Sequence, residues 1–136
     1  VIYPSQDNTL KSIDNDHSLV LLGKYRDFSI LLTGDIEKLG IEQMLSESKL
    51  PVVTILKIPH HGSRGSLAPE LYEQTKPQYG IISAGKNNNF GHPHAEIIKS
   101  LEDIGAKALR TDQGGLIYIE TDGRRLQIKR PMQVNY

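Results

Sequence analysis

The chain contains no cysteine among its 136 residues. Disulfide bonds, thiolate zinc sites and a cysteine nucleophile are therefore excluded. No apolar run approaches the roughly 20 residues that a membrane-spanning helix needs. The first residues lack the basic start and long apolar core of a signal peptide, and position 1 is valine rather than methionine. We therefore expect the chain to be a soluble piece of a longer protein.

The charged residues balance, because lysine plus arginine and aspartate plus glutamate both number 16. The chain thus lacks the excess of one sign that typifies a surface for nucleic acid or membranes. A basic group near the C-terminus is divided by strand alternation between two faces, which favours a solvated strand edge. Its members are Arg124, Arg125, Lys129 and Arg130. The nucleophile elbow, the Walker glycine loop and the H-E-x-x-H zinc motif are absent.

Apolar runs and helical periodicities alternate along the chain in the manner of an α/β domain. Two apolar runs around a polar turn predict a hairpin, followed by three helix–strand units and a closing hairpin with an Asp-Gly turn. The predicted strands are residues 18–22, 28–32, 52–56, 79–83, 108–110, 115–120 and 125–129, and the predicted helices are residues 36–48, 67–75 and 94–104. Residues 4–17 and 131–136 read as a loop and a tail. We predict one domain, residues 1–136, with a mixed β-sheet and flanking helices.

A carboxylate follows the second predicted strand, in the run Thr33-Gly34-Asp35. α/β proteins place their sites at such strand ends, and Gly34 lets the backbone bend sharply there. Two interpretations of Asp35 are open. It can cap the N-terminus of the following helix, or it can bind and bridge metal ions.

Two adjacent histidines follow the next strand, in the run His60-His61-Gly62-Ser63. Neighbouring histidines on a loop point in different directions, so one can bind a metal while the other moves a proton or contacts substrate. Gly62 permits close approach of another backbone, and the Ser63 hydroxyl can bind an anionic group. The alternative is an ordinary surface loop with two solvated histidines.

A third loop, residues 83–94, follows the next strand and is rich in glycine and asparagine, which is typical of a turn. It also contains Lys86, His92 and His94. Four of the five histidines fall in this loop and the preceding one, and only His17 lies elsewhere. Such clustering at neighbouring strand ends favours a functional site.

Several motifs, in order along nearly the whole chain, resemble the ComEC/Rec2-type branch of the metallo-β-lactamase superfamily. The pair Leu-Leu-Thr-Gly-Asp and His-His-Gly-Ser is fairly specific to this branch and its close hydrolase relatives. The matching runs are residues 15–21, 31–35, 56–63, 82–85 with Asn87, 91–93, 110–112 and 114–117. The resemblance implies the C-terminal half of an αββα sandwich.

The same resemblance implies roles for individual residues. Asp35 would bridge two divalent ions, zinc or manganese, and His61 would be the late histidine ligand. His60 would lie beside the metals as a catalytic residue that contacts the scissile phosphate or assists proton transfer. The substrate cleft would be lined by Lys57, which also counts as catalytic, and by Ser63, Asn87 and His92.

The resemblance further implies a location and a substrate. In ComEC-like proteins this domain follows a membrane channel for DNA uptake, on the extracytoplasmic side of the bacterial cytoplasmic membrane. There it is expected to act on single-stranded or double-stranded DNA. Relatives with the same motifs cleave other phosphodiesters, including phosphocholine esters.

The chain lacks the family's H-x-H-x-D-H run, which supplies most of the metal ligands. Asp35 and one or two histidines are too few, because zinc or manganese needs about four ligands. We therefore expect the C-terminal portion of a hydrolase domain whose other half lies upstream. Alone, it should bind metal weakly, lack nuclease activity and self-associate through the apolar face left open. A non-enzymatic α/β interaction module is the alternative.

Overall fold

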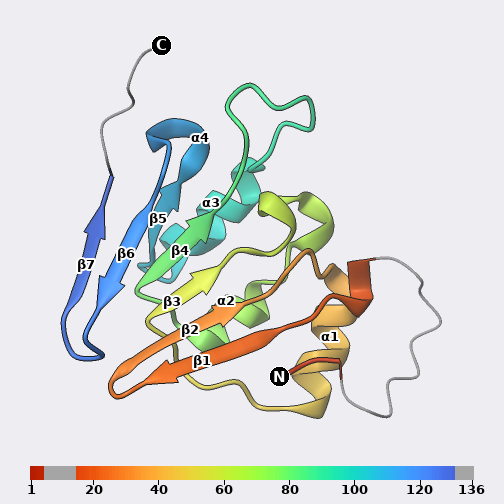
Figure 1. Ribbon diagram of the computed structural model, residues 1–136. Coiled ribbons are helices and arrows are strands. Elements are labelled where there is room, and N and C mark those ends of the chain that lie inside the picture. Colours follow the sequence, from red (N-terminus) through yellow and green to blue (C-terminus); the bar gives the residue numbers. More distant parts are fainter. Residues whose placement is uncertain (5–14, 131–136) are drawn as a thin grey trace.

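The computed structural model describes residues 1–4 and 15–130, and Figure 1 shows how its elements are arranged. The strands are β1 (Leu21–Tyr25), β2 (Phe28–Leu32), β3 (Ile55–Lys57), β4 (Tyr79–Ile82), β5 (Lys107–Arg110), β6 (Tyr118–Thr121) and β7 (Leu126–Lys129). The helices are α1 (Lys38–Glu47), α2 (Pro69–Thr75), α3 (Ala95–Asp103) and α4 (Thr111–Gly114), with short 3₁₀ turns η1 (Asn15–His17), η2 (Pro59–Gly62) and η3 (Arg64–Ser66). The predicted tail and residues 5–14 of the predicted loop lie outside the described residues.

Five strands form one sheet in the order β1-β2-β3-β4-β5. β1 pairs antiparallel with β2, whereas β2, β3, β4 and β5 run parallel to one another. Parallel neighbours need a crossover, and α1, α2 and α3 supply the three crossovers in turn. The predicted α/β fold with a mixed sheet and flanking helices is therefore confirmed.

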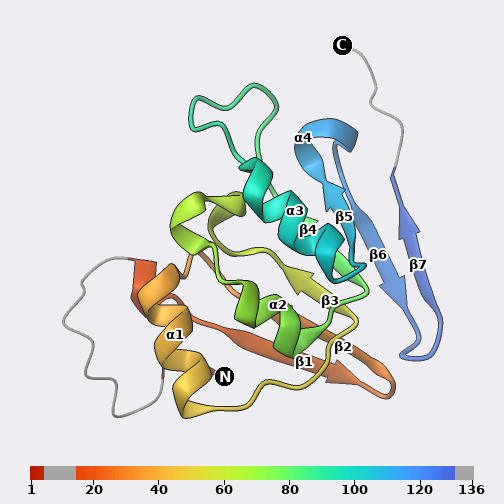
Figure 2. The same cartoon turned by 180° about the vertical axis from the view of Figure 1, so that it is seen from behind.

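Helices α1, α2 and α3 cover one face of the sheet, and Figure 2 shows them in front of it. The core lies between the two layers. It includes Leu31, Leu56, Ile58 and Ile82 from the sheet side, and Ile41, Met44, Leu71, Ile97 and Leu101 from the helices. At Gly80 on β4 an added Cβ would lie 2.8 Å from a Leu101 methyl carbon, so glycine lets α3 pack closely.

The opposite side of the sheet is an open face with no helix among the described elements (Figure 1). Leu31 and Leu56 point into the helix-covered core, and strand alternation therefore places Ile30, Leu32 and Ile55 on the opposite side, where Ile55 is buried and Ile30 is half-buried. Leu32 is 41% exposed. Of these three side chains, Leu32 is therefore the one that leaves apolar surface uncovered on this side of the sheet.

The β6–β7 hairpin forms a separate two-stranded antiparallel sheet. A cleft of about 470 Å³ separates it from β4 and β5, lined by Tyr79, Lys107, Ala108, Leu109, Leu126, Ile128 and Arg130. Its turn lies beside the β1–β2 turn in both views, where the Asp27 amide donates to the Gly123 carbonyl at 2.9 Å. Arg26 Nη1 donates to the Asp122 carbonyl at 3.1 Å. Because a lone two-stranded sheet is marginally stable, these contacts anchor the hairpin.

The structure also departs from the expected boundaries. Helix α1 begins at Lys38 rather than at residue 36, and its cap comes from a distant residue, because Asp16 Oδ1 accepts from the Gly40 amide at 2.9 Å. The strand expected at residues 52–56 is Ile55–Lys57 instead, since the Val53 amide donates to the Thr75 carbonyl at the end of α2. Helix α4 and the 3₁₀ turns were not anticipated by periodicity.

The open face leads to a prediction about association. We expect the chain to form concentration-dependent oligomers in light scattering, and Leu32→Lys to shift it toward monomer because the new charge would have to be buried. Leu39 is 57% exposed on α1, away from the open face, so Leu39→Lys is the matched control and should leave association unchanged. A wild-type chain that is monomeric at all concentrations would contradict the prediction.

Candidate functional site

The functional residues gather at one edge of the sheet because β2, β3, β4 and β5 all end there (Figure 1). Leu32 pairs with Lys57, and Lys57 pairs with Ile81, so these strand ends lie nearly level. The loop after each strand carries one group of the predicted site residues. The structure therefore brings together the runs that the sequence singles out.

Asp35 lies in the turn between β2 and α1, and the backbone reaches it through Gly34, whose φ is +57°. A Cβ on Gly34 would lie 3.2 Å from Ser18 Cβ, so the turn fits closely against the chain before β1. The N-cap position of α1 is Glu37, and the side chain that caps the helix is Asp16. The interpretation of Asp35 as a helix cap is therefore wrong.

The histidine turn η2 has an unusual backbone. His60, His61 and Gly62 have φ angles of +44°, +57° and +81°, in the left-handed region that non-glycine residues rarely adopt. Such strain persists only where surrounding contacts hold it. Here the His60 amide donates to the Gly34 carbonyl at 3.2 Å, and Ser66 Oγ donates to the Pro59 carbonyl at 3.0 Å. The turn thus presents two imidazoles in succession at the strand end.

His61 has the orientation of a metal ligand. Its Nδ1 lies 2.6 Å from the carbonyl oxygen of Ser83, and since a carbonyl only accepts, Nδ1 carries the proton. The Nε2 atom then faces Asp35 Oδ2 at 3.8 Å. Metal-bound histidines commonly donate their other nitrogen to a carbonyl in this way. Two ligand atoms that each bind one ion at about 2.1 Å, at a tetrahedral angle, lie roughly 3.4 Å apart. The 3.8 Å between Nε2 and Oδ2 is close to this value, so the two atoms fit one ion.

His60 points toward the carboxylate of Glu37, a residue outside the motifs named above. Its Nδ1 lies 2.8 Å from Glu37 Oε1, in an orientation that leaves this buried nitrogen without a hydrogen-bond partner in the described structure. Asn15 Nδ2 also approaches Glu37 Oε1, at 3.4 Å. Glu37 comes two residues after Asp35, and this spacing is the sequence feature that could have identified it as a site residue.

The loop of residues 83–94 packs directly against the histidine turn. The His94 amide donates to the Gly62 carbonyl at 3.0 Å, and His94 Nδ1 accepts from the Arg64 amide at 3.1 Å. A Cβ on Gly62 would lie 2.6 Å from Pro93 Cβ, so only glycine allows this approach.

The result is a cluster of four imidazoles, as the sequence predicts. The His92 ring centroid lies 5.8 Å from that of His60, 6.4 Å from that of His61 and 5.1 Å from that of His94. Burial lowers the pKa of His92, and the three nearby imidazoles lower it further. His92 is therefore biased toward its neutral form, which can accept a proton or a hydrogen bond.

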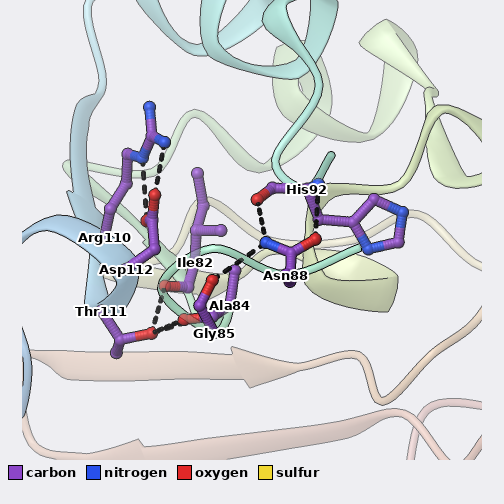
Figure 3. A network of polar contacts seen from close by, with 8 residues as sticks. All are labelled: Ile82, Ala84, Gly85, Asn88, His92, Arg110, Thr111 and Asp112. Carbon is purple, nitrogen blue, oxygen red and sulfur yellow. Dashed lines mark hydrogen bonds and ion pairs between the residues drawn. The ribbon is translucent and has the colours of Figure 1, made fainter. Parts of the chain in front are cut away.

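Asn88 fixes the conformation of this loop, as Figure 3 shows. Its Nδ2 donates to the carbonyls of Gly85 at 2.9 Å and His92 at 2.7 Å. Its Oδ1 accepts from the amides of Phe90 at 3.2 Å and His92 at 3.0 Å. The family motif assigns the neighbouring Asn87 to the substrate cleft. Asn87 is an exposed turn residue with φ +59°, and its role there stays a prediction. An asparagine run does not reveal which member turns inward.

The segment after β5 supports the end of β4 (Figure 3). Thr111 Oγ1 donates to the Ala84 carbonyl at 2.8 Å and accepts from the Ala84 amide at 2.9 Å. Arg110 and Asp112 form a two-pronged ion pair with distances of 3.0 and 2.6 Å. Because Ser83 precedes Ala84, this contact holds the carbonyl that orients His61.

Lys57 and Ser63 have structural partners of their own. Lys57 Nζ donates to the Ile58 carbonyl at 2.8 Å. Burial lowers the pKa of Lys57, while the charge of Asp35 opposes that shift. Ser63 Oγ accepts from the Gly65 amide at 3.2 Å and caps η3. The charges of Lys57 and Asp35 therefore attract each other, whereas Ser63 stabilises the loop.

The donor set for a metal is partial. Across residues 1–4 and 15–130, no group of three or more histidine, aspartate or glutamate side chains is arranged to hold a metal ion. Asp35 and His61 fit as two ligands of one ion, by the distance and tautomer given above. The described residues therefore supply fewer side-chain ligands than the about four that zinc commonly takes.

The fold and the site together define an α/β domain with a carboxylate–imidazole pair at the ends of its parallel strands. The chain is 42% identical over 103 residues to "ComE operon protein 3" of Bacillus subtilis, 32% over 126 residues to "Recombination protein 2" of Haemophilus influenzae and 30% over 105 residues to "Competence protein ComA" of Neisseria gonorrhoeae. These similarities show that the chain is a ComEC/Rec2-type domain, as its motifs predict. No family model matches it.

The chain spans a small part of these relatives. The alignments cover 76%, 93% and 76% of the chain, but only 13%, 16% and 15% of the three proteins, in the same order. Among the described residues, no helix has the length and apolar character of a membrane span.

The ion pair after β5 gives a prediction about acid stability. The hydrogen bonds from Arg110, and then its charge, hold the pKa of Asp112 below its ordinary value of 3.8. The carboxylate therefore stabilises the fold fully above about pH 4, and the stabilisation is lost as the pH falls through the lower folded pKa. Asp112→Asn should lower the free energy of unfolding by about 1–3 kcal/mol at pH 7.

Denaturant unfolding between pH 7 and pH 2 checks this prediction. The difference between wild type and Asp112→Asn should shrink below about pH 4, because the wild-type carboxyl group becomes neutral there. Asp103→Asn is a useful control, since Asp103 pairs with Lys99 on the exposed side of α3 and such pairs contribute little. A difference that stays constant with pH would contradict the prediction.

Proposed function

We propose that the chain is the C-terminal part of a metal-dependent phosphodiesterase domain, a DNase of a ComEC-like DNA-uptake protein. The observation that carries the proposal is the Asp35–His61 pair, with Nε2 and Oδ2 3.8 Å apart and His61 oriented by the Ser83 carbonyl. The names of the relatives point to competence and DNA uptake. Together they support DNA as the substrate.

Asp35 and His61 would hold divalent metal, zinc or manganese, with two ions in the complete domain. Such ions activate a bound water and stabilise charge on the phosphate oxygens. The chain's own side chains would prepare the surroundings. Lys57, whose charge attracts that of Asp35, would add positive charge to the site. His60 lies near both Glu37 and His92, where it would contact a phosphate or move a proton. His92 and the loop that holds it would border the substrate.

The rest of the metal shell would come from the part of the protein upstream of this chain. The relatives are several times longer than the chain, which leaves room for a segment with the H-x-H-x-D-H run. The open face supports this arrangement, because one sheet with helices on one side is half of an αββα sandwich. The missing half would pack against the exposed part of this face, which includes Leu32. In the full protein the domain would stand beside a membrane channel, on the extracytoplasmic side.

Two comparisons test the function. The isolated chain should bind Mn²⁺ or Zn²⁺ weakly in calorimetry and should not cleave DNA. A longer segment of the parent protein that includes the upstream half should cleave DNA in a metal-dependent manner. There, Asp35→Ala and His61→Ala should each lower the rate by more than about 100-fold.

His17→Ala serves as the matched control, because His17 lies in η1 rather than in the two histidine loops. It should retain most of the activity. Two results would contradict the proposal: tight stoichiometric metal binding by the isolated chain, or a longer segment whose activity survives Asp35→Ala. Cleavage of phosphocholine esters but not of DNA would support the proposed metal site and contradict DNA as the proposed substrate. A longer segment that binds no metal and cleaves neither substrate would favour a non-enzymatic interaction module.

A further inference from the structure

An aromatic ring stands exposed at the rim of the candidate site. Phe90 is 76% exposed, in the loop between β4 and α3. Large apolar side chains at such exposure are common singly and need no explanation. Phe90 differs because its surroundings fix it in place and because it adjoins the functional residues.

One contact orients the ring of Phe90, and another fixes the backbone that carries it. The ring stacks on the imidazole of His92, with centroids 5.7 Å apart and planes 25° from parallel. The Phe90 amide donates to Asn88 Oδ1 at 3.2 Å. Asn88 also bonds to the backbone of His92, as Figure 3 shows. The ring is therefore presented in a defined orientation.

A small hollow lies beside the ring. It has a volume of about 190 Å³ and is lined by His61, Ala84, Gly85, Asn88, Phe90 and His92. Its lining thus joins the aromatic ring to His61, one of the two proposed metal ligands. A flat group lying on Phe90 would therefore border the hollow that His61 also lines. Lys86, exposed in this loop, adds a positive charge.

We propose that Phe90 is a stacking platform for an unpaired nucleobase next to the scissile phosphate. Every base has an apolar π-face, and exposed aromatic rings bind single-stranded nucleic acid by stacking without sequence preference. A base in a duplex is already stacked on its neighbours, so only a base that is unpaired or at a frayed end can occupy the platform. This inference rests on the proposed phosphodiesterase function and narrows its substrate to single-stranded segments.

The test uses a short single-stranded oligonucleotide carrying 2-aminopurine, whose fluorescence is quenched when it stacks. Binding is measured without added metal, to the chain and to the longer segment. Phe90→Leu should raise the dissociation constant about tenfold and abolish the added quenching, because leucine keeps the apolar volume but not the flat ring. Phe90→Tyr should remain within about twofold of wild type. An oligonucleotide with abasic sites should bind wild type and Phe90→Leu equally.

The outcomes separate this inference from the proposed function. Equal affinity of wild type and Phe90→Leu for the base-containing probe overturns the platform. The platform is also overturned if Phe90→Leu weakens binding of the abasic probe as much as that of the base-containing probe, or if neither protein binds the base-containing probe. If Phe90→Leu behaves as wild type while Asp35→Ala still removes cleavage, the platform fails and the phosphodiesterase stands. If the platform binds bases but the longer segment never cleaves DNA, the proposed function fails instead.

Discussion

The parallel register of β2, β3 and β4 is the constraint on which the candidate site depends. Leu32, Lys57 and Ile81 lie side by side across the three strands, so the chain leaves the sheet at three nearly level points. Asp35, His61 and Ser83 follow those points within a few residues. The Ser83 carbonyl can therefore orient His61, and His61 can face Asp35. A shift of one residue in either pairing would turn the strand side chains to the opposite face and separate these groups.

The strained backbone at His60 and His61 is held by its neighbours on both sides. The Gly34 carbonyl holds it from the β2 loop, and the His94 amide bonds to Gly62 from the β4 loop. Non-glycine residues in this conformation cost about 1–3 kcal/mol each, and such a cost is typical of functional sites. The contact between Thr111 and Ala84 extends the support to β5. All four parallel strands thus contribute to the position of two imidazoles.

Sequence patterns predicted the α/β class, the clustering of the histidines and the placement of Asp35 at a strand end, because these follow from local periodicity and from parallel topology. The remaining features arise from contacts between distant residues. Asp16 caps α1 from 24 residues away, which shifts the start of the helix and removes the capping role from Asp35. Asn88 rather than Asn87 closes the loop, and Glu37 meets His60 only after both turns are built. Such choices between adjacent residues depend on which side chain points inward.

The central claim is that Asp35 and His61 form one side of a metal site. The most direct measurement is titration of the isotopically labelled chain with Mn²⁺, followed by NMR, because a bound paramagnetic ion broadens the signals nearest to it even when binding is weak. We expect the resonances of Asp35 and His61 to broaden first, those of the β6–β7 hairpin to stay sharp, and Asp35→Asn to remove this selectivity. Broadening that begins elsewhere in the chain, or that Asp35→Asn leaves unchanged, would contradict the claim.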